Sequence, residues 1–372
     1  MPPAVLDAFR KGAAASVSIE HLQAAASRCI AEITQTDAGL VTAGSAAGLT
    51  LGAAAILCGS DPGRMERLPQ CDDIPHEFIV AREQRSGYDH AVRASGARLV
   101  EVGFNEIVAG AGVRRTEVWE YEAAIGPSTA GIFYVYAPDS QPPLDALVAL
   151  AREHRLPVLV DAAGEVPPRE NLRAITATGV DLVSFSGGKA IRGPQSTGIL
   201  CGRRDLITST AMQMLDMDDH WELWEPPADW IDKSQFQGIA RHGIGRALKV
   251  SKEEIVALLT ALELFDSGAY DDELPKFRGY LDSICHALDA SPVECEIVDF
   301  PDGERLPILE ISLTPRSAES AFDVCRRLRQ GAPPVYVGHG KLAAGKLVVQ
   351  PLCLQDEQIA LLGERLKDEL AN

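Results

Sequence analysis

A lysine and an aspartate, each placed after an apolar run, are the residues of this chain best suited to chemistry. Asp161 ends the run Pro157-Val-Leu-Val-Asp161, and Lys189 follows the run Val180–Ser186 after two glycines. Short apolar runs of this kind are typical of buried strands, and ligands of open α/β sheets bind at the carboxyl ends of strands. A lysine amine placed there can form an imine with a carbonyl group, and a carboxylate beside it stabilises a cation.

A third feature indicates a phosphate-bearing ligand. The small-residue turn Ala43-Gly-Ser-Ala-Ala47 precedes an expected helix, and the free amides of a helix N-terminus bind phosphate. The hydroxyl of Ser186 could donate to the same phosphate. An imine-forming lysine, a carboxylate for a ring nitrogen and a phosphate cradle are what pyridoxal 5′-phosphate (PLP) requires. The sequence therefore predicts PLP held as a Schiff base on Lys189, with Asp161 at the pyridine nitrogen.

The expected elements place these residues in an α/β fold with a largely parallel sheet. Apolar runs predict strands at 77–80, 98–102, 131–137, 157–161, 180–186 and 197–202. Helical periodicity is found between them, at 19–33, from the small-residue turn to residue 58, and at 143–154. Strands that alternate with helices indicate a sheet flanked by helices.

The pattern changes after about residue 212. A helix is expected over 251–264, capped by Ser251 with Glu254 at the capping-box position. Strands at 308–313 and 346–350 and helices at 318–329 and 356–370 predict a smaller α+β C-terminal domain. We therefore expect a large cofactor-binding domain over residues 36–245 and a small domain formed by 1–35 and 246–372.

These motifs carry a resemblance to a known family. Asp161-Ala-Ala163 and Ser186-Gly-Gly-Lys189, followed by Arg-Gly193-Pro-Gln, are similar to PLP-dependent enzymes of fold type I. More narrowly, they resemble the family that contains selenocysteine synthase (L-seryl-tRNA selenium transferase) and D-glucosaminate-6-phosphate ammonia-lyase. The segments 87–103 and 245–254 extend the resemblance over most of the chain. It implies that Lys189 carries PLP and that Asp161 binds the pyridine nitrogen. It also implies a homodimer or larger homo-oligomer, because the Gly-Pro-Gln turn reaches a neighbouring subunit's phosphate.

The predicted cofactor-binding residues follow from these motifs together. They are Lys189, Asp161, Ala163, Ser186, Gly44, Ser45, Ala46, Tyr88 and Gly193, of which Lys189 and Asp161 are catalytic. Tyr88 is preferred over His90 as the aromatic group that stacks on the ring. One departure concerns Gly188, where selenocysteine synthase typically has Asp.

Other polar residues leave alternatives open. Arg246, Lys249 and Lys252 are either a solvated helix face or an anchor for a substrate carboxylate or phosphate. His242 and His339 are not assigned. The stretch 212–237 holds three of the four tryptophans and many acids, which suggests a surface excursion. Its part from Trp221 to Trp230 is either a mobile cover on the pocket or an oligomer contact.

Composition limits the partners. A formal net charge of −18 disfavours nucleic acid, so we expect none, and tRNA modification is the less favoured activity within the family. The eight cysteines form no C-x-x-C pair, so no metal site is expected. An 18-residue apolar run and a signal peptide are both absent, which predicts a cytoplasmic protein that does not contact membranes.

The predicted function is a PLP-dependent lyase of the ammonia-lyase type. Removal of the Cα proton from a small anionic amino acid or amino-sugar acid, followed by β-elimination, gives a keto acid and ammonia. The alternative is a racemase, an aldolase or a selenocysteine-synthase-like transferase that uses the same carbanion, since these reactions share every residue identified.

Overall fold

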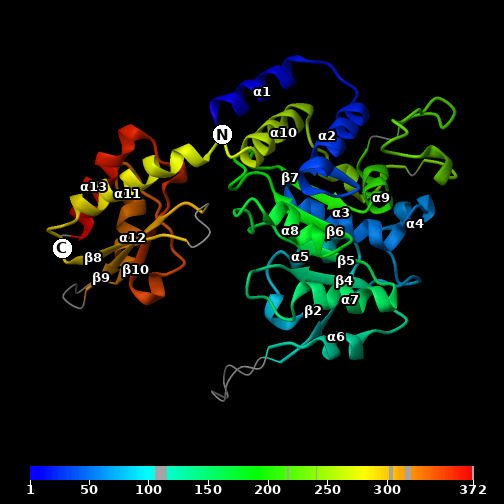
Figure 1. The fold of residues 1–372 in the computed structure, drawn as a ribbon, viewed down its shortest axis with the longest axis horizontal. Helices are drawn as coiled ribbons and strands as arrows, with labels where there is room; N and C mark the ends of the chain where they lie inside the picture. The colour runs from blue at the N-terminus through cyan, green and yellow to red at the C-terminus, as the bar shows by residue number, and fades with distance from the viewer. Residues whose placement is uncertain (105–114, 216–217, 240, 301–304, 315–319, 371–372) are drawn as a thin grey trace. The chain divides into compact units, whose positions relative to one another are not determined.

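The computed structural model describes residues 1–104, 115–215, 218–239, 241–300, 305–314 and 320–370 (Figure 1). The chain divides into two compact units, Met1–Ser267 and Gly268–Asn372. Each unit has a hydrophobic core of its own. We therefore describe the units separately.

Unit 1 is built on a seven-stranded sheet in the order β1-β7-β6-β5-β4-β2-β3. Strands β2 to β6 run parallel to their neighbours, whereas β7 pairs antiparallel with both β6 and β1. The strands are β1 (Ala38–Thr42), β2 (Glu77–Ala81), β3 (Arg98–Val102), β4 (Thr129–Val135), β5 (Val158–Asp161), β6 (Leu182–Ser186) and β7 (Gly198–Gly202). The mostly parallel sheet confirms the expected α/β class. Strand β1 was not predicted from the sequence.

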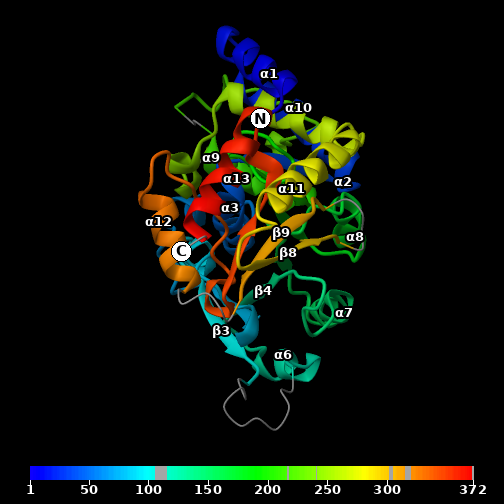
Figure 2. The same ribbon diagram turned by 90° about the vertical axis from the view of Figure 1, so that its left-hand side faces the viewer.

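Helices cover both faces of this sheet (Figures 1 and 2). Two neighbouring residues of β1 face opposite sides of the sheet. Gly39 lies against α2, because a Cβ on it would lie 2.3 Å from Ile30. Leu40 belongs to the core on the other face, beneath α3 and α9. Helices α2 (Ile19–Thr34), α7 (Leu144–His154) and α8 (Asn171–Ala177) contact the sheet from one layer, and α3 (Gly44–Cys58) and α9 (Arg204–Met214) from the other. The remaining helices are α1 (Pro3–Ala14), α4 (Pro62–Arg67), α5 (Asp89–Ala94), α6 (Val118–Ala124) and α10 (Lys252–Asp266), with 3₁₀ turns η1 (Arg82–Gln84), η3 (Lys233–Gln235) and η4 (Ile244–Leu248).

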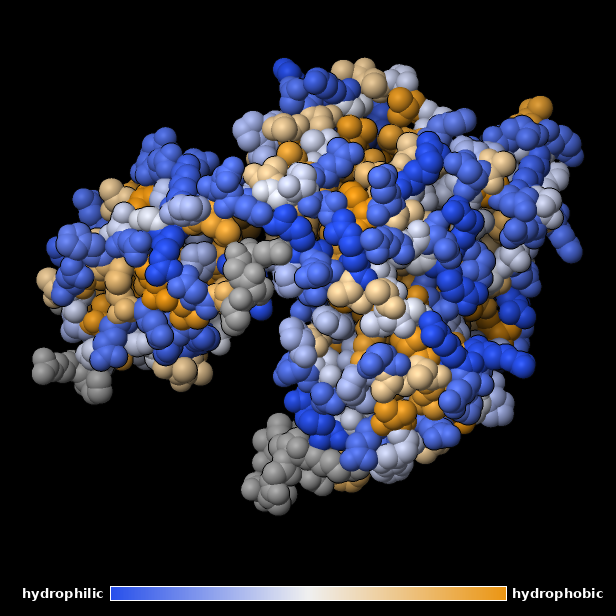
Figure 3. All heavy atoms as spheres, in the orientation of Figure 1, coloured by the Kyte–Doolittle hydropathy of each residue, from blue (hydrophilic) through white to orange (hydrophobic). Residues whose placement is uncertain are grey.

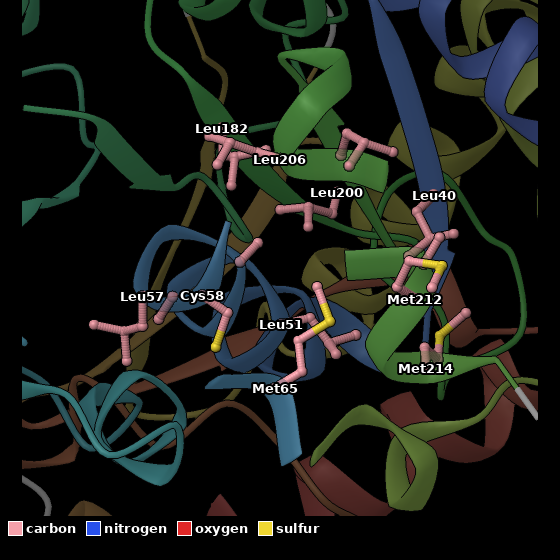
Figure 4. Packing of buried hydrophobic residues seen from close by; sticks show 14 of the residues in the cluster. Leu40, Leu51, Leu57, Cys58, Met65, Leu182, Leu200, Leu206, Met212 and Met214 are labelled. Atoms are coloured by element: carbon pink, nitrogen blue, oxygen red, sulfur yellow. The ribbon is translucent and has the colours of Figure 1, made fainter. Parts of the chain in front are cut away.

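Small residues let α3 lie close to the sheet. A Cβ on Gly52 would lie 2.9 Å from the Leu159 side chain, so a larger residue would push the helix away. The fully buried Leu40, Leu51 and Leu200 converge in the core between α3, α9 and the sheet (Figure 4). This close packing places the start of α3 against the ends of β6 and β7.

Unit 2 has a three-stranded antiparallel sheet in the order β10-β9-β8, covered by helices. Its elements are α11 (Leu274–Ala287), β8 (Val293–Val298), β9 (Ile308–Leu313), α12 (Ala321–Gln330), β10 (Lys346–Val349) and α13 (Asp356–Leu370), with 3₁₀ turns η5 (Asp271–Glu273), η6 (Leu342–Ala344) and η7 (Pro351–Cys353). The expected β9, β10, α12 and α13 are present, although residues 318 and 319 of the predicted helix lie outside the described residues. Strand β8 was not predicted.

The N-terminal helices and α10 pack within unit 1. Helix α1 lies along α10, and α2 contacts β1 (Figures 1 and 2). The predicted capping box at the start of α10 is present: the Ser251 hydroxyl accepts the Glu254 amide, and the Glu254 carboxylate accepts the Ser251 amide. The two compact units divide after residue 267. The predicted division into a large domain over 36–245 and a small domain formed by 1–35 and 246–372 stays a prediction.

The tryptophan segment, residues 218–236, is part of the core of unit 1. Trp224 and Trp230 are each only 2% exposed, and both belong to the cluster that contains α3 and α9. The Trp224 Nε1 donates to Glu20 Oε1 at 2.7 Å, and the Thr208 hydroxyl donates to the Trp230 carbonyl at 3.0 Å. The prediction of a surface excursion is therefore wrong for these residues, because their indole rings fill space against α2 and α9.

The surface of the molecule mixes polar and apolar groups. Hydrophilic side chains cover most of the visible face of unit 1, with hydrophobic ones scattered between them (Figure 3). Among the described residues, no helix combines the length and the hydropathy needed to cross a membrane.

Candidate active site

Asp161 is a buried carboxylate at the carboxyl end of β5. Its side chain accepts one hydrogen bond, from the Ala163 amide to Oδ1 at 3.0 Å, and the residue is 7% exposed. Burial raises the pKa of this carboxyl, and the Ala163 amide and the positive charge of Lys189 partly oppose that effect. Its other oxygen, Oδ2, accepts no hydrogen bond from the described residues. The carboxylate is therefore ready to pair with a cationic N–H group.

Lys189 lies in a tight loop after the neighbouring strand β6. The Gly193 amide donates to the Gly187 carbonyl at 2.9 Å, and the Arg192 amide donates to the Lys189 carbonyl at 2.9 Å. A Cβ on Gly164 would lie 3.8 Å from Lys189 Nζ, so the ammonium lies over the turn that follows Asp161. No described residue forms a hydrogen bond with this ammonium. The structure thus brings the two predicted catalytic residues together at one edge of the sheet.

Glycines make the lysine loop possible. A Cβ on Gly188 would lie 2.5 Å from Gln195 Cα, and one on Gly187 would lie 2.5 Å from the Thr197 Oγ1. Any side chain at residue 188 would therefore displace the backbone that follows Lys189. This contact explains why the loop has Gly188 at the position where the resemblance leads one to expect Asp.

The N-terminus of α3 lies against β6, which carries Ser186, and against β7, which carries its strand partner Gly198. A Cβ on Gly198 would lie 2.4 Å from the Ser45 amide nitrogen, and the Ser184 hydroxyl donates to the Ser45 carbonyl at 2.9 Å. Ser186 is paired directly with Gly198 and shares its face of the sheet with Ser184. The predicted Ser186 hydroxyl therefore lies on the side of the sheet where α3 begins.

The first turn of α3 offers amides to an anion. Gly44 has φ +85°, a conformation that favours glycine, and within the described chain no side chain caps this helix start. The first amides of a helix lack intrahelical partners, and the helix dipole favours negative charge there. Gly44, Ser45 and Ala46 are half-buried, so a phosphate can approach them from solvent.

A hollow of about 370 Å³ opens beside this helix start. It is lined by Ala43, Ala46, Ala47, Thr50, Gly87, Tyr88, His90, Ala91 and Leu248. Tyr88 is 64% exposed. Both candidate aromatic residues line the same hollow, so the choice of Tyr88 over His90 stays a prediction.

The structure separates Lys252 from the two other predicted basic residues, Arg246 and Lys249. Lys252 donates to the carbonyls of Gly12 and Ala13, both at 2.9 Å, and so caps the end of α1. Its contacts remove Lys252 from the candidate substrate anchors. Arg246 and Lys249 belong to η4 and the residue after it, beside Leu248 of the hollow.

The two histidines without an assigned role lie elsewhere. His242 pairs with Asp218 at 3.1 Å, and the preceding Arg241 amide donates to Glu66 of α4, beyond the C-terminal end of α3. His339 belongs to unit 2, where its Nδ1 lies 3.5 Å from the Arg329 guanidinium. No described cluster of three His, Cys, Asp or Glu side chains could hold a metal ion.

Sequence reasoning missed one residue of the site. Asp89 follows Tyr88 directly and is 2% exposed, and its negative charge contributes to the raised pKa of Asp161. The signal in the sequence was its place in Gly87-Tyr-Asp-His90, where attention went to the two aromatic neighbours. Its proximity to Asp161 depends on folding, because the two carboxylates lie 72 positions apart in the chain.

The residues present fit PLP. The half-satisfied carboxylate of Asp161 suits a protonated ring nitrogen, and the uncapped amides of α3 suit a phosphate. Lys189 is close enough to Asp161 for both to reach one ring-sized ligand. This donor set was predicted from the sequence alone.

Several known proteins are similar to this chain, in sequence and in structure. The family model of L-seryl-tRNA selenium transferase matches residues 89–217. A 5′-C-glycyluridine monooxygenase-decarboxylase of a Streptomyces species is 29% identical over 98% of this chain and 85% of its own length. A D-glucosaminate-6-phosphate ammonia lyase of Salmonella typhimurium is 27% identical over 98% of this chain and 90% of its own length. A solved structure of D-glucosaminate-6-phosphate ammonia-lyase covers 100% of this chain and 91% of its own, with a TM-score of 0.78 and 25% identity.

Proposed function

We propose that this chain is a PLP-dependent lyase of the fold-type-I family that contains L-seryl-tRNA selenium transferase and D-glucosaminate-6-phosphate ammonia-lyase. Its substrate is a small anionic amino acid or amino-sugar acid with a leaving group such as hydroxide on Cβ. The overall reaction loses water and then takes it up again, giving a keto acid and ammonia. The observation that carries the proposal is the convergence of Asp161, Lys189 and the α3 amides at one edge of the sheet.

Each residue has a role that follows from its place. When bound, PLP supplies an electron sink for the negative charge left at Cα. Lys189 provides the attachment point and then the amine that removes the Cα proton. Asp161 holds the ring nitrogen in its cationic form, because an adjacent anion raises the proton affinity of that nitrogen. The amides of Gly44, Ser45 and Ala46 and the Ser186 hydroxyl bind the phosphate.

The remaining predicted contacts complete the proposal. Tyr88 stacks on the ring from the hollow beside α3, and Arg246 and Lys249 bind the anionic groups of the substrate. Ala163 and Gly193 contribute backbone on either side of the lysine. We further propose a cytoplasmic homodimer or larger homo-oligomer in which the Gly193-Pro-Gln turn reaches a neighbouring subunit.

The cofactor assignment is tested by trapping. After reconstitution with PLP and reduction with borohydride, peptide mass spectrometry should find the cofactor on Lys189. Lys189→Ala should lose this adduct and at least about 10³-fold in activity, while Lys276→Ala, a change to an exposed lysine of unit 2, should keep both. Reduction of PLP onto a different lysine would contradict the assignment.

The reaction is tested by a screen of hydroxylated amino acids and amino-sugar acids. The lyase should release ammonia and a keto acid in equal amounts without consuming dioxygen. Rapid exchange of the Cα proton without either product would indicate a racemase, and salt-sensitive binding of seryl-tRNA would indicate the transferase.

A second candidate function comes from the Streptomyces relative, whose name describes a monooxygenase-decarboxylase. In that case dioxygen would oxidise the same Cα carbanion, with the substrate supplying the electrons. The carboxylate would leave as carbon dioxide, one oxygen atom would stay on Cα, and the other would leave as water. Measurement of dioxygen uptake and carbon dioxide release in the same screen separates the two functions.

A further inference from the structure

Asp89, which lies in the chain between Tyr88 and His90 of the hollow, belongs to a network of charged groups. It is the first residue of α5, is 2% exposed and forms an ion pair with Arg85. It also accepts the Ser86 amide at 3.3 Å. Arg85 pairs in turn with Glu101 of β3, which accepts Arg82 at 3.1 Å. The buried carboxylate of Asp89 therefore holds the turn 85–89 together through its contacts with Arg85 and the Ser86 amide.

This turn is fixed to the elements that form the site. The Thr50 hydroxyl of α3 donates to the Ala91 carbonyl at 2.7 Å, and the Val135 amide of β4 donates to Gln84 Oε1 at 3.1 Å. Tyr88 lies between these two connections and faces the hollow beside α3. Breaking the Arg85–Asp89 pair would free the turn that presents this ring.

The turn that holds Asp89 is also tied to the strand beside Asp161. The Val135 amide donates to Gln84 at the start of this turn, and Val135 is the strand partner of Asp161. Asp161 and Asp89 are both buried, and like charges near one another under little solvent favour a proton or a cation. Lys189 faces Asp161 from the loop after β6, and Arg85 compensates Asp89, with Glu101 behind it. Asp89 therefore adds negative charge at the place where a cationic ring nitrogen would bind.

We propose that Arg85 and Asp89 form a positioning pair that presents Tyr88 to the ring and sets how strongly Asp161 holds a cation. The inference rests on the proposed function, since it names residues that act through Asp161 and Tyr88 on the bound cofactor. Neither residue touches the reacting atoms. A purely structural ion pair at the start of α5 is the alternative.

A charge-setting role and a purely structural role of the Arg85–Asp89 pair predict different changes in the pKa of Asp161. If the pair acts by charge, Asp89→Asn removes a negative neighbour and lowers the pKa of Asp161, whereas Arg85→Gln leaves Asp89 uncompensated and raises it. If the pair is only structural, both changes loosen the turn and admit water to Asp161. Both would then lower its pKa, because burial is the main cause of the raised value.

The closing experiment titrates Asp161 in the full-length, cofactor-free protein by ¹³C NMR of labelled aspartate. The signal of Asp161 is assigned by its loss in Asp161→Asn. We expect opposite shifts for Asp89→Asn and Arg85→Gln, and the wild-type midpoint for Arg85→Lys. Arg98→Gln is the matched control, because Arg98 pairs with Glu77 at 3.2 Å at the opposite ends of β2 and β3. Equal shifts downward in both variants, or no shift in either, would overturn the inference.

A second measurement uses the reconstituted protein. Asp89→Asn should raise the dissociation constant for PLP by roughly 10-fold, because the ring nitrogen loses a nearby negative charge. An unchanged constant would contradict the charge-setting role. If the wild type binds no PLP, the proposed function fails, while the titration of Asp161 still decides the inference about the pair.

Discussion

The edge of the sheet that carries Asp161 and Lys189 and the tryptophan segment of unit 1 differ in how many hydrogen bonds their side chains form within the protein. At the edge, Asp161 accepts one hydrogen bond, and no described residue forms a hydrogen bond with the Lys189 ammonium. In the tryptophan segment, Trp224 is buried, its indole N–H donates to Glu20, and its carbonyl accepts Lys233 Nζ at 2.6 Å. The edge keeps its polar groups available for a ligand, whereas the segment uses them to hold unit 1 together.

The difference shows how one unit divides stability from function. Close contacts at Gly187 and Gly188 hold the lysine loop in shape. The loop therefore does not depend on hydrogen bonds from the Lys189 side chain. A buried carboxylate of this kind costs folding free energy until a cation binds. The large apolar contacts of the tryptophan segment offset such costs elsewhere in the unit.

The largest effect is expected from Trp224→Ala. Loss of a buried indole should reduce the free energy of unfolding by about 3–5 kcal/mol, measured by urea denaturation. PLP should still attach to Lys189 in the molecules that remain folded. Trp119→Ala, a change to a 54% exposed tryptophan, is the control and should cost much less. A Trp224 variant of normal stability would mean that the segment is a cover and not part of the core.

Asp161→Asn should have the next largest effect, on chemistry. Loss of the charge beside the ring nitrogen should slow exchange of the Cα proton by about 10²-fold, measured by hydrogen–deuterium exchange into the substrate. Binding of PLP should weaken less. Asp145→Asn, on the exposed face of α7, should leave the exchange rate unchanged. Full activity of Asp161→Asn would remove this residue from the mechanism.

In the cofactor-free protein, Asp161→Asn should change thermal stability and its dependence on pH. Because burial raises the pKa of Asp161 in the folded state, its ionisation opposes folding as the pH rises through that raised pKa. Asp161→Asn removes this penalty, so the cofactor-free variant should unfold at a higher temperature than wild type at neutral pH. The gain should shrink as the pH falls from the raised pKa of Asp161 toward the ordinary pKa of an aspartate, and it should vanish below that ordinary value. A gain that is constant with pH would contradict the linkage.

Gly188→Ala tests whether backbone contacts shape the edge. The new Cβ would lie 2.5 Å from Gln195 Cα, which should cost about 1–3 kcal/mol of stability and reduce the borohydride-trapped adduct. Gly238→Ala is the matched control, because no atom of the described residues lies within 4 Å of a Cβ at that position. Equal adduct yields in the two variants would show that the loop tolerates a side chain.

The smallest effect is expected from Arg246→Ala. Loss of a ground-state contact with the substrate carboxylate should raise KM by about 10-fold and change kcat less. Arg241→Ala is the control, since Arg241 lies on the same segment but its amide bonds to Glu66 near α4. An unchanged KM in steady-state assays would remove Arg246 from the proposed substrate site.

Several elements could be predicted because their signals are local. Strand β3 matches the predicted range, and the capping box of α10 is present where Ser251 and Glu254 indicated it. Strands β1 and β8 were missed. Strand β1 is short and leads directly into the small-residue turn, and β8 alternates polar with apolar residues between stronger helical signals.

The sequence by itself determined which residues are proposed to bind the cofactor, because that proposal depends on the types and the spacing of Asp161, Lys189 and the glycines around them. Only the tertiary structure decided what surrounds them. It placed Asp89 near Asp161, took Lys252 to the end of α1 and buried Trp224 against α2. These three outcomes depend on contacts between segments far apart in the chain. Periodicity and turn signals report only on near neighbours, so they carry no information about such contacts.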